Sequence, residues 1–90
     1  MTTIYKYEIK VQDTFVLQIP MYGHILKVAR QGGSIYAWVK GDTQRENVPI
    51  TLRIFGTGHP LPIEEENLTY LDTVIMEHFV WHIFIKANTC

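Results

Sequence analysis

The chain of 90 residues has a single cysteine, Cys90, at its last position. One cysteine cannot build an internal disulfide framework, so we expect a terminal thiol without a structural role. No apolar run approaches the roughly 20 residues that cross a bilayer as a helix, and residues 1–6 lack the apolar core of a signal peptide. The sequence therefore predicts a cytoplasmic protein that does not enter a membrane.

The chain also lacks an excess of positive charge. Eight lysine and arginine residues stand against nine aspartate and glutamate residues, which gives a formal net charge of −1. Proteins that follow a phosphate backbone normally show a clear basic excess, so we expect no direct binding of long nucleic acid. A local basic spot is still compatible with this balance. Ninety residues are enough for one core but not for two, so residues 1–90 are predicted to form a single domain.

Apolar and polar residues alternate with a period of two along most of the chain, which is typical of half-buried strands. Gly32-Gly33 predicts a tight hairpin turn, and a second turn is expected near Glu77-His78. The segments expected as strands are residues 5–11, 15–19, 24–30, 35–40, 50–54, 70–76 and 79–86. About seven short, mostly antiparallel strands with at most one helical turn, at 64–67, predict an all-β barrel or sandwich.

A different interpretation of residues 64–78 makes them an amphipathic helix packed on a sheet. Val74 and Ile75 are β-branched, and Thr69 and Thr73 add to the preference for a strand. We therefore favour the strand.

The most distinctive segment is residues 53–60, where an apolar strand ends in a loop with two glycines. Glycine has no Cβ, so the N–H groups of such a loop can approach a bound group closely. We predict that the loop and its neighbours hold a phosphate or carboxylate, with the ligand-binding residues Arg53, Phe55, Gly56, Thr57, Gly58 and His59. The alternative is a plain glycine turn that Pro60 extends, with Arg53 on a solvated face.

Tyr36 and Trp38 are the aromatic candidates for ligand binding. They share one face of a strand whose other face, Ile35, Ala37 and Val39, is already apolar. If the aromatic face is exposed, it can stack a base or anchor a protein interface; the alternative is core packing. In so small a chain, strands that are apolar on both faces leave apolar surface exposed to solvent. A second copy of the chain would cover this surface, so we also expect a homo-oligomer.

Metal binding and catalysis have little support in the sequence. His78 and His82 are four residues apart, which in a strand is roughly 13 Å and too far to share a metal. Thr57 and His59 have no acidic residue beside them to orient the imidazole. We expect no metal, no cofactor and no enzymatic activity.

Four segments together resemble a family of small proteins encoded by bacteriophages and bacterial genomes. They are Ile4-Tyr5-Lys6-Tyr7, Tyr36-Ala37-Trp38-Val39, Arg53-Ile54-Phe55-Gly56-Thr57-Gly58-His59-Pro60 and Val80-Trp81-His82-Ile83-Phe84. The resemblance spans nearly the whole chain, and the third segment is its most specific part. It implies a stand-alone β domain in a phage or prophage setting, and hence the cytoplasm of the host cell. It assigns no site residues.

A phage setting suggests a binding protein that antagonises host defence. In one mechanism the protein sequesters a small anionic nucleotide: the glycine loop and Arg53 take the phosphate, and an aromatic such as Trp38 stacks the base. In the other, the aromatic face and acidic loops block a host defence protein, such as an effector that processes nucleic acid. A structural or virion accessory role, through exposed strand edges, is the third possibility.

Overall fold

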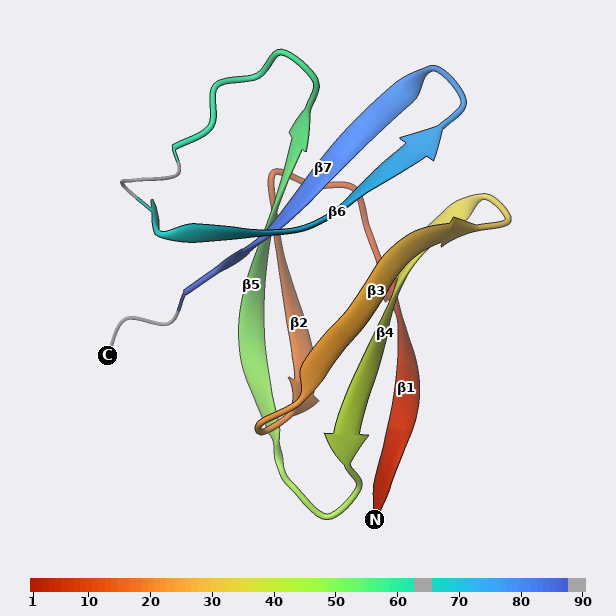
Figure 1. Cartoon of the computed structure of the whole chain (residues 1–90), viewed down its shortest axis with the longest axis vertical. Helices are drawn as coiled ribbons and strands as arrows, with labels where there is room; N and C mark the ends of the chain where they lie inside the picture. The colour runs from red at the N-terminus through yellow and green to blue at the C-terminus, as the bar shows by residue number, and fades with distance from the viewer. Residues whose placement is uncertain (63–65, 88–90) are drawn as a thin grey trace.

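The structure is a computed structural model that describes residues 1–62 and 66–87, which form seven strands in two sheets (Figure 1). The strands are β1 (Thr2–Ile9), β2 (Thr14–Pro20), β3 (His24–Gln31), β4 (Ser34–Asp42), β5 (Asn47–Gly56), β6 (Leu68–Met76) and β7 (Phe79–Lys86). One sheet has the order β1-β4-β3 and the other β2-β5-β7-β6, and all neighbours are antiparallel. The all-β prediction is confirmed, and the two open sheets make the fold sandwich-like rather than a closed barrel.

The core lies between the two sheets because the inward-facing residues of each strand are apolar. Ile35, Ala37 and Val39 of β4 are at most 1% exposed, as the alternation in that strand predicts. On the four-stranded sheet, Leu52 of β5 and Ile83 of β7 are completely buried. The other buried members of this core are Ile9, Leu17, Ile19, Val28, Ile54 and Val74.

Two edge strands, β3 and β6, contact each other along one side of the sandwich. Each carries a β-bulge, β3 between Ile25 and Lys27 and β6 between Tyr70 and Asp72. The Asp72 carboxylate joins the two edges, because it accepts hydrogen bonds from the Val28 N–H at 3.1 Å and from Lys27 Nζ at 3.4 Å. A bulge interrupts strand pairing and turns the chain, which brings this carboxylate to the opposite sheet.

Several details differ from the sequence prediction. Strict alternation over the expected strand 24–30 predicts Leu26 on the same face as Val28, but the bulge turns Leu26 outward, where it is 48% exposed. Val11 was expected on the apolar face of the first strand, but β1 ends at Ile9 and Val11 is exposed. The strand expected over residues 35–40 continues to Asp42, so Gly41, predicted to begin a polar loop after that strand, lies in β4, where a Cβ would come within 2.9 Å of the Pro20 ring.

The turns follow the prediction. Gly32 has a φ of 62° between β3 and β4, and Glu77 has a φ of 54° between β6 and β7. Strand β6 rules out the helix at 64–78. The expected helical turn at 64–67 lies partly outside the described residues; within them, the Glu66 N–H donates to the Pro62 carbonyl at 3.0 Å. Cys90 also lies outside the described residues.

In the described part of the chain, no helix is both long and apolar enough to span a bilayer.

Candidate functional site

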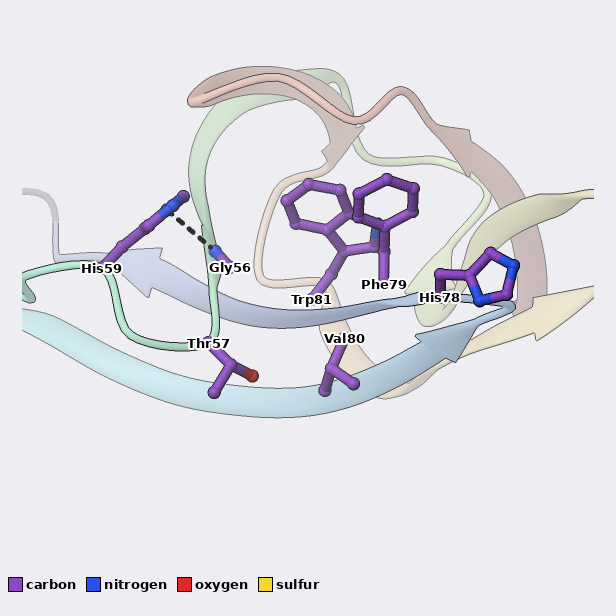
Figure 2. Close-up of a pocket in the computed structure, with 7 residues that line it drawn as sticks. All are labelled: Gly56, Thr57, His59, His78, Phe79, Val80 and Trp81. Atoms are coloured by element: carbon purple, nitrogen blue, oxygen red, sulfur yellow. Dashed lines mark hydrogen bonds between the residues drawn. The ribbon is translucent and has the colours of Figure 1, made fainter.

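The glycine loop lies at the end of the four-stranded sheet, beside the β6–β7 hairpin. β5 ends at Gly56, which pairs with Trp81 of β7. This pairing brings residues 57–59 next to the start of β7, although some 20 residues of chain separate them. Between them is a hollow of about 290 Å³ (Figure 2), lined by Gly56, Thr57, His59, His78, Phe79, Val80 and Trp81. This volume is close to the lower end of small-molecule sites, which start at roughly 300 Å³.

A stacked aromatic pair forms one wall of the hollow. The rings of Phe79 and Trp81 are 5.7 Å apart between centroids with 13° between their planes. Both point to the same side of β7 because they are two residues apart in a strand, and Figure 2 shows them on the side where His59 lies. Phe79 is 60% exposed. Gly56, opposite Trp81, has no side chain, and the His59 ring lies where a Cβ at Gly56 would point.

His59 forms the facing wall, and its ring rests on Gly56. The Gly56 N–H donates to His59 Nδ1 at 3.3 Å, and the His59 N–H donates to the Gly56 carbonyl at 3.2 Å. Gly58 closes this turn with a φ of 91°, a conformation that favours glycine. Because Nδ1 accepts a hydrogen bond, we assign the proton of the neutral ring to Nε2. The ring therefore offers an N–H donor beyond its own turn.

A chain of hydrogen bonds fixes the other side of the loop. Thr57 Oγ1 lies 2.9 Å from His82 Nε2, and His82 Nδ1 lies 3.1 Å from Thr73 Oγ1. Thr73 Oγ1 in turn lies 2.6 Å from the Tyr70 hydroxyl. Hydroxyls thus engage both ring nitrogens of His82, where a catalytic triad would have a carboxylate behind the imidazole. We interpret the chain as an anchor that ties the loop to β6 and β7.

Arg53 and Phe55 lie on the outer face of the four-stranded sheet. Arg53 Nε donates to the Asp13 carbonyl at 3.0 Å, and the guanidinium pairs with Glu66 and lies 5.0 Å from the centroid of the Phe55 ring. Phe55 is buried with two other apolar residues in a small outer cluster, Phe55, Leu68 and Phe84. The Arg53 guanidinium is therefore paired with Glu66 and is not directed at the glycine loop.

Tyr36 and Trp38 lie on the far side of the molecule, on the outer face of the three-stranded sheet. Both are half-buried and alternate with the buried residues of β4. Of the predicted ligand-binding residues, the structure thus brings Gly56, Thr57, Gly58 and His59 together and places Arg53 and Phe55 beside another cluster. It separates Tyr36 and Trp38 from the loop, so in one molecule they do not contact the same ligand.

Sequence reasoning missed the residues that complete the hollow, His78, Phe79 and Trp81. Their contribution depends on the pairing of Gly56 with Trp81. Two features of the sequence together could have indicated the hollow: one strand ends in a glycine, and another carries aromatic residues at alternate positions. Within residues 1–62 and 66–87, no group of three histidine, cysteine, aspartate or glutamate side chains is arranged to hold a metal ion.

A protein-family model matches residues 1–89, nearly the entire chain, and its description is Domain of unknown function (DUF7352). The chain belongs to the DUF7352 family. No curated protein and no solved structure gives a significant match. For this member of the DUF7352 family, the geometry of the site is therefore the basis for inferring function.

The ion pair between Arg53 and Glu66 makes the stability of this DUF7352 domain depend on pH. The hydrogen bond from Arg53 lowers the pKa of Glu66 below its ordinary value of 4.5. A carboxylate with a lowered pKa stabilises the fold above its unfolded-state pKa, and this contribution disappears as the pH falls through the folded-state pKa. We expect Glu66→Gln to be less stable than the wild type at pH 7 and to approach it below about pH 4.

Urea denaturation of both proteins at pH 7 and pH 3 measures this difference. Arg53→Gln removes the other partner of the pair and also the hydrogen bond to the Asp13 carbonyl, so it should show at least the same loss at pH 7. A difference between wild type and Glu66→Gln that is equal at the two pH values would contradict the assignment.

Proposed function

We propose that the protein binds, without catalysing a reaction, a small ligand that combines a flat ring with an anionic group, as a nucleotide does. The ligand occupies the hollow between the glycine loop and the β6–β7 hairpin. The observation that carries this proposal is the stacked pair of exposed Phe79 and half-buried Trp81 facing His59 across the hollow.

The ring of the ligand stacks on the aromatic pair. Phe79 exposes 60% of its surface to water, although burying an aromatic side chain is favourable. A flat ring laid on this pair covers apolar surface without requiring the protein to rearrange. Stacking of a nucleic-acid base on an aromatic side chain contributes about 1–3 kcal/mol.

The anionic group lies against the loop. Gly58 keeps the backbone accessible because it has no side chain, and the His59 ring offers its Nε2–H donor. His78, in the turn before β7, lines the same hollow. These groups replace Arg53 in our proposal, because Glu66 already pairs with the guanidinium. A hollow of about 290 Å³ is suited to one small ligand rather than to a polymer.

Thermal unfolding with a panel of mono-, di- and cyclic nucleotides tests the proposal. A ligand that binds only the folded state at 100 times its Kd stabilises it by about 2.7 kcal/mol, which raises the Tm of a domain this size by roughly 15 °C. Trp81→Ala should abolish this rise. Trp38→Ala removes the other tryptophan, on the far face, and should leave it unchanged. If no nucleotide raises the Tm of the wild type, the proposal is wrong.

Gly56→Ala separates loop geometry from folding. A Cβ at Gly56 would come within 3.1 Å of His59 Cε1, which is closer than ordinary van der Waals contact, so the exposed imidazole must shift away from Gly56. The backbone of Gly56 does not have a positive φ, so we expect a stability change below about 1 kcal/mol. We expect about a tenfold loss of affinity for the anionic ligand, since the charge-assisted contact from His59 is lost. Calorimetric titration of both proteins measures this loss, and unchanged affinity would exclude His59 from the site.

One observation favours a second candidate, an inhibitor that blocks a host defence protein. Two large apolar side chains near the β6–β7 turn are exposed, Ile75 at 66% and Phe79 at 60%. Such residues are typical anchors of a protein interface. A stable co-purifying partner that Phe79→Ala releases, together with no response to nucleotides, would favour this candidate. Phage origin, antagonism of host defence, a virion role and self-association stay predictions.

A further inference from the structure

The outer face of the three-stranded sheet carries an ordered array of aromatic and basic side chains. In its central row, Trp38 of β4 lies between Lys6 of β1 and Lys27 of β3. Lys40 and Tyr36 occupy the neighbouring outward positions of β4. Directly opposite residues in adjacent strands share a face of the sheet, so these five side chains project from one surface.

The charge of this surface is positive despite the net charge of −1 for the whole chain. Its carboxylates are matched by cations: Glu8, which lies opposite Tyr36, binds Lys10 at 3.0 Å, and Asp42 binds the N-terminal amine at 3.2 Å. Lys27 makes a long contact, 3.4 Å, with Asp72 at the sheet edge. Lys6 and Lys40 are exposed and lie to either side of the aromatic residues.

The rings of Tyr36 and Trp38 are neighbours on this face. Their centroids are 6.2 Å apart and their planes are tilted by 55°, and each residue is half-buried at its base. The Lys6 ammonium is 4.2 Å from the centroid of the Tyr36 ring and 6.0 Å from that of Trp38. The Lys6 ammonium therefore covers the Tyr36 ring, and it is placed to meet a phosphate next to a base that stacks on Trp38.

We propose that this face binds a short segment of single-stranded nucleic acid. A base stacks on Trp38, and Lys6 and Lys40 contact the phosphates, whereas Lys27 pairs with Asp72. Stacking together with a positive surface is the general mode of single-strand binding, and it tolerates different base sequences. A duplex fits this face poorly because its bases are already stacked on one another. The site is independent of the hollow at the glycine loop.

Fluorescence anisotropy with labelled single strands of about ten nucleotides, oligo-dT and oligo-rU, tests the proposal. We expect both strands to bind the wild type at low salt, more tightly than a duplex of the same length. Trp38→Ala should weaken binding by at least about fivefold. The logarithm of the affinity falls by about 0.7 per phosphate contact for each unit of log salt concentration, so Lys6→Gln and Lys40→Gln should each reduce this slope by about 0.7.

Lys86→Gln is the matched charge control, because Lys86 is an exposed lysine at the end of β7 on the other sheet. Lys86→Gln should not change the affinity. Circular dichroism of Trp38→Ala checks the fold, and the two lysine variants keep the test decisive if that variant unfolds.

Three results would overturn the proposal. The first is no binding of either strand at low salt. The second is an equal loss of affinity in Lys86→Gln and Lys40→Gln, which would show that the strands bind by nonspecific electrostatic attraction rather than at this face. The third is an acidic peptide that competes fully with the strands and loses the same affinity in Trp38→Ala, which would identify the face as a protein interface. A preference for oligo-rU over oligo-dT would support the proposal and specify RNA.

Discussion

Replacing Ile83 with alanine is expected to lower the free energy of unfolding by about 2–5 kcal/mol. Ile83 lies in β7, an inner strand of the four-stranded sheet, and its side chain is completely buried. It is paired with Ile54 on one side and Asp72 on the other, at the centre of the shared core. Truncating the side chain loses the free energy of transferring the deleted atoms out of water, and the cavity left behind adds a further loss of stability.

Ile75→Ala is the matched control on the neighbouring strand. Ile75 lies in β6 and is 66% exposed, so the same chemical change should cost less than about 0.5 kcal/mol. Urea denaturation at neutral pH measures both values. Similar losses in the two variants would contradict the placement of the core between the sheets.

Replacing Asp72 with alanine is expected to cost about 1–3 kcal/mol. Asp72 Oδ2 accepts a hydrogen bond from the N–H of Val28, a residue of the opposite sheet. Asp72 Oδ1 accepts a hydrogen bond from the N–H of Thr73 at 3.1 Å. Alanine leaves the partly buried N–H of Val28 without a partner. Bonds from backbone donors to a charged acceptor are stronger than neutral ones, so this contact between edges is worth more than a surface ion pair.

Lys27→Met separates the two components of the Asp72 contact. It removes only the long, exposed ammonium contact and keeps the hydrogen bond from Val28, so it should cost less than about 1 kcal/mol. Hydrogen exchange of the Val28 amide adds a local readout, since exchange should accelerate in Asp72→Ala and stay slow in Lys27→Met. If Lys27→Met costs as much as Asp72→Ala, the ammonium rather than the backbone holds the edges together.

The strands could be predicted because their side chains alternate strictly. Ile35, Ala37 and Val39 against Tyr36 and Trp38 define both faces of β4, and the structure has the same faces. The two bulges could not be predicted, because a bulge depends on which strand is the partner. Leu26 was therefore placed on the wrong face, and the contact of Asp72 with β3 was not foreseen.

The glycine loop could be located from its residues, but its surroundings could not. Gly56, Gly58 and His59 predict a tight turn from local sequence alone. The aromatic wall instead depends on the pairing of Gly56 with Trp81, some 25 residues further along the chain. The partner of Arg53 was equally hidden, since Glu66 follows a stretch without strong periodicity. A sequence shows local conformation well and leaves open which distant side chain neutralises a charge or fills a space.

The most direct test of ligand binding in the hollow uses Trp38→Phe, which leaves Trp81 as the only tryptophan of the chain. Titrating this variant with the nucleotide that most raises the Tm should quench the Trp81 emission to saturation, and Gly56→Ala in the same background should shift the midpoint about tenfold higher. Emission that does not change as nucleotide is added, or the same midpoint with and without Gly56→Ala, would contradict a ligand held between the aromatic pair and the glycine loop.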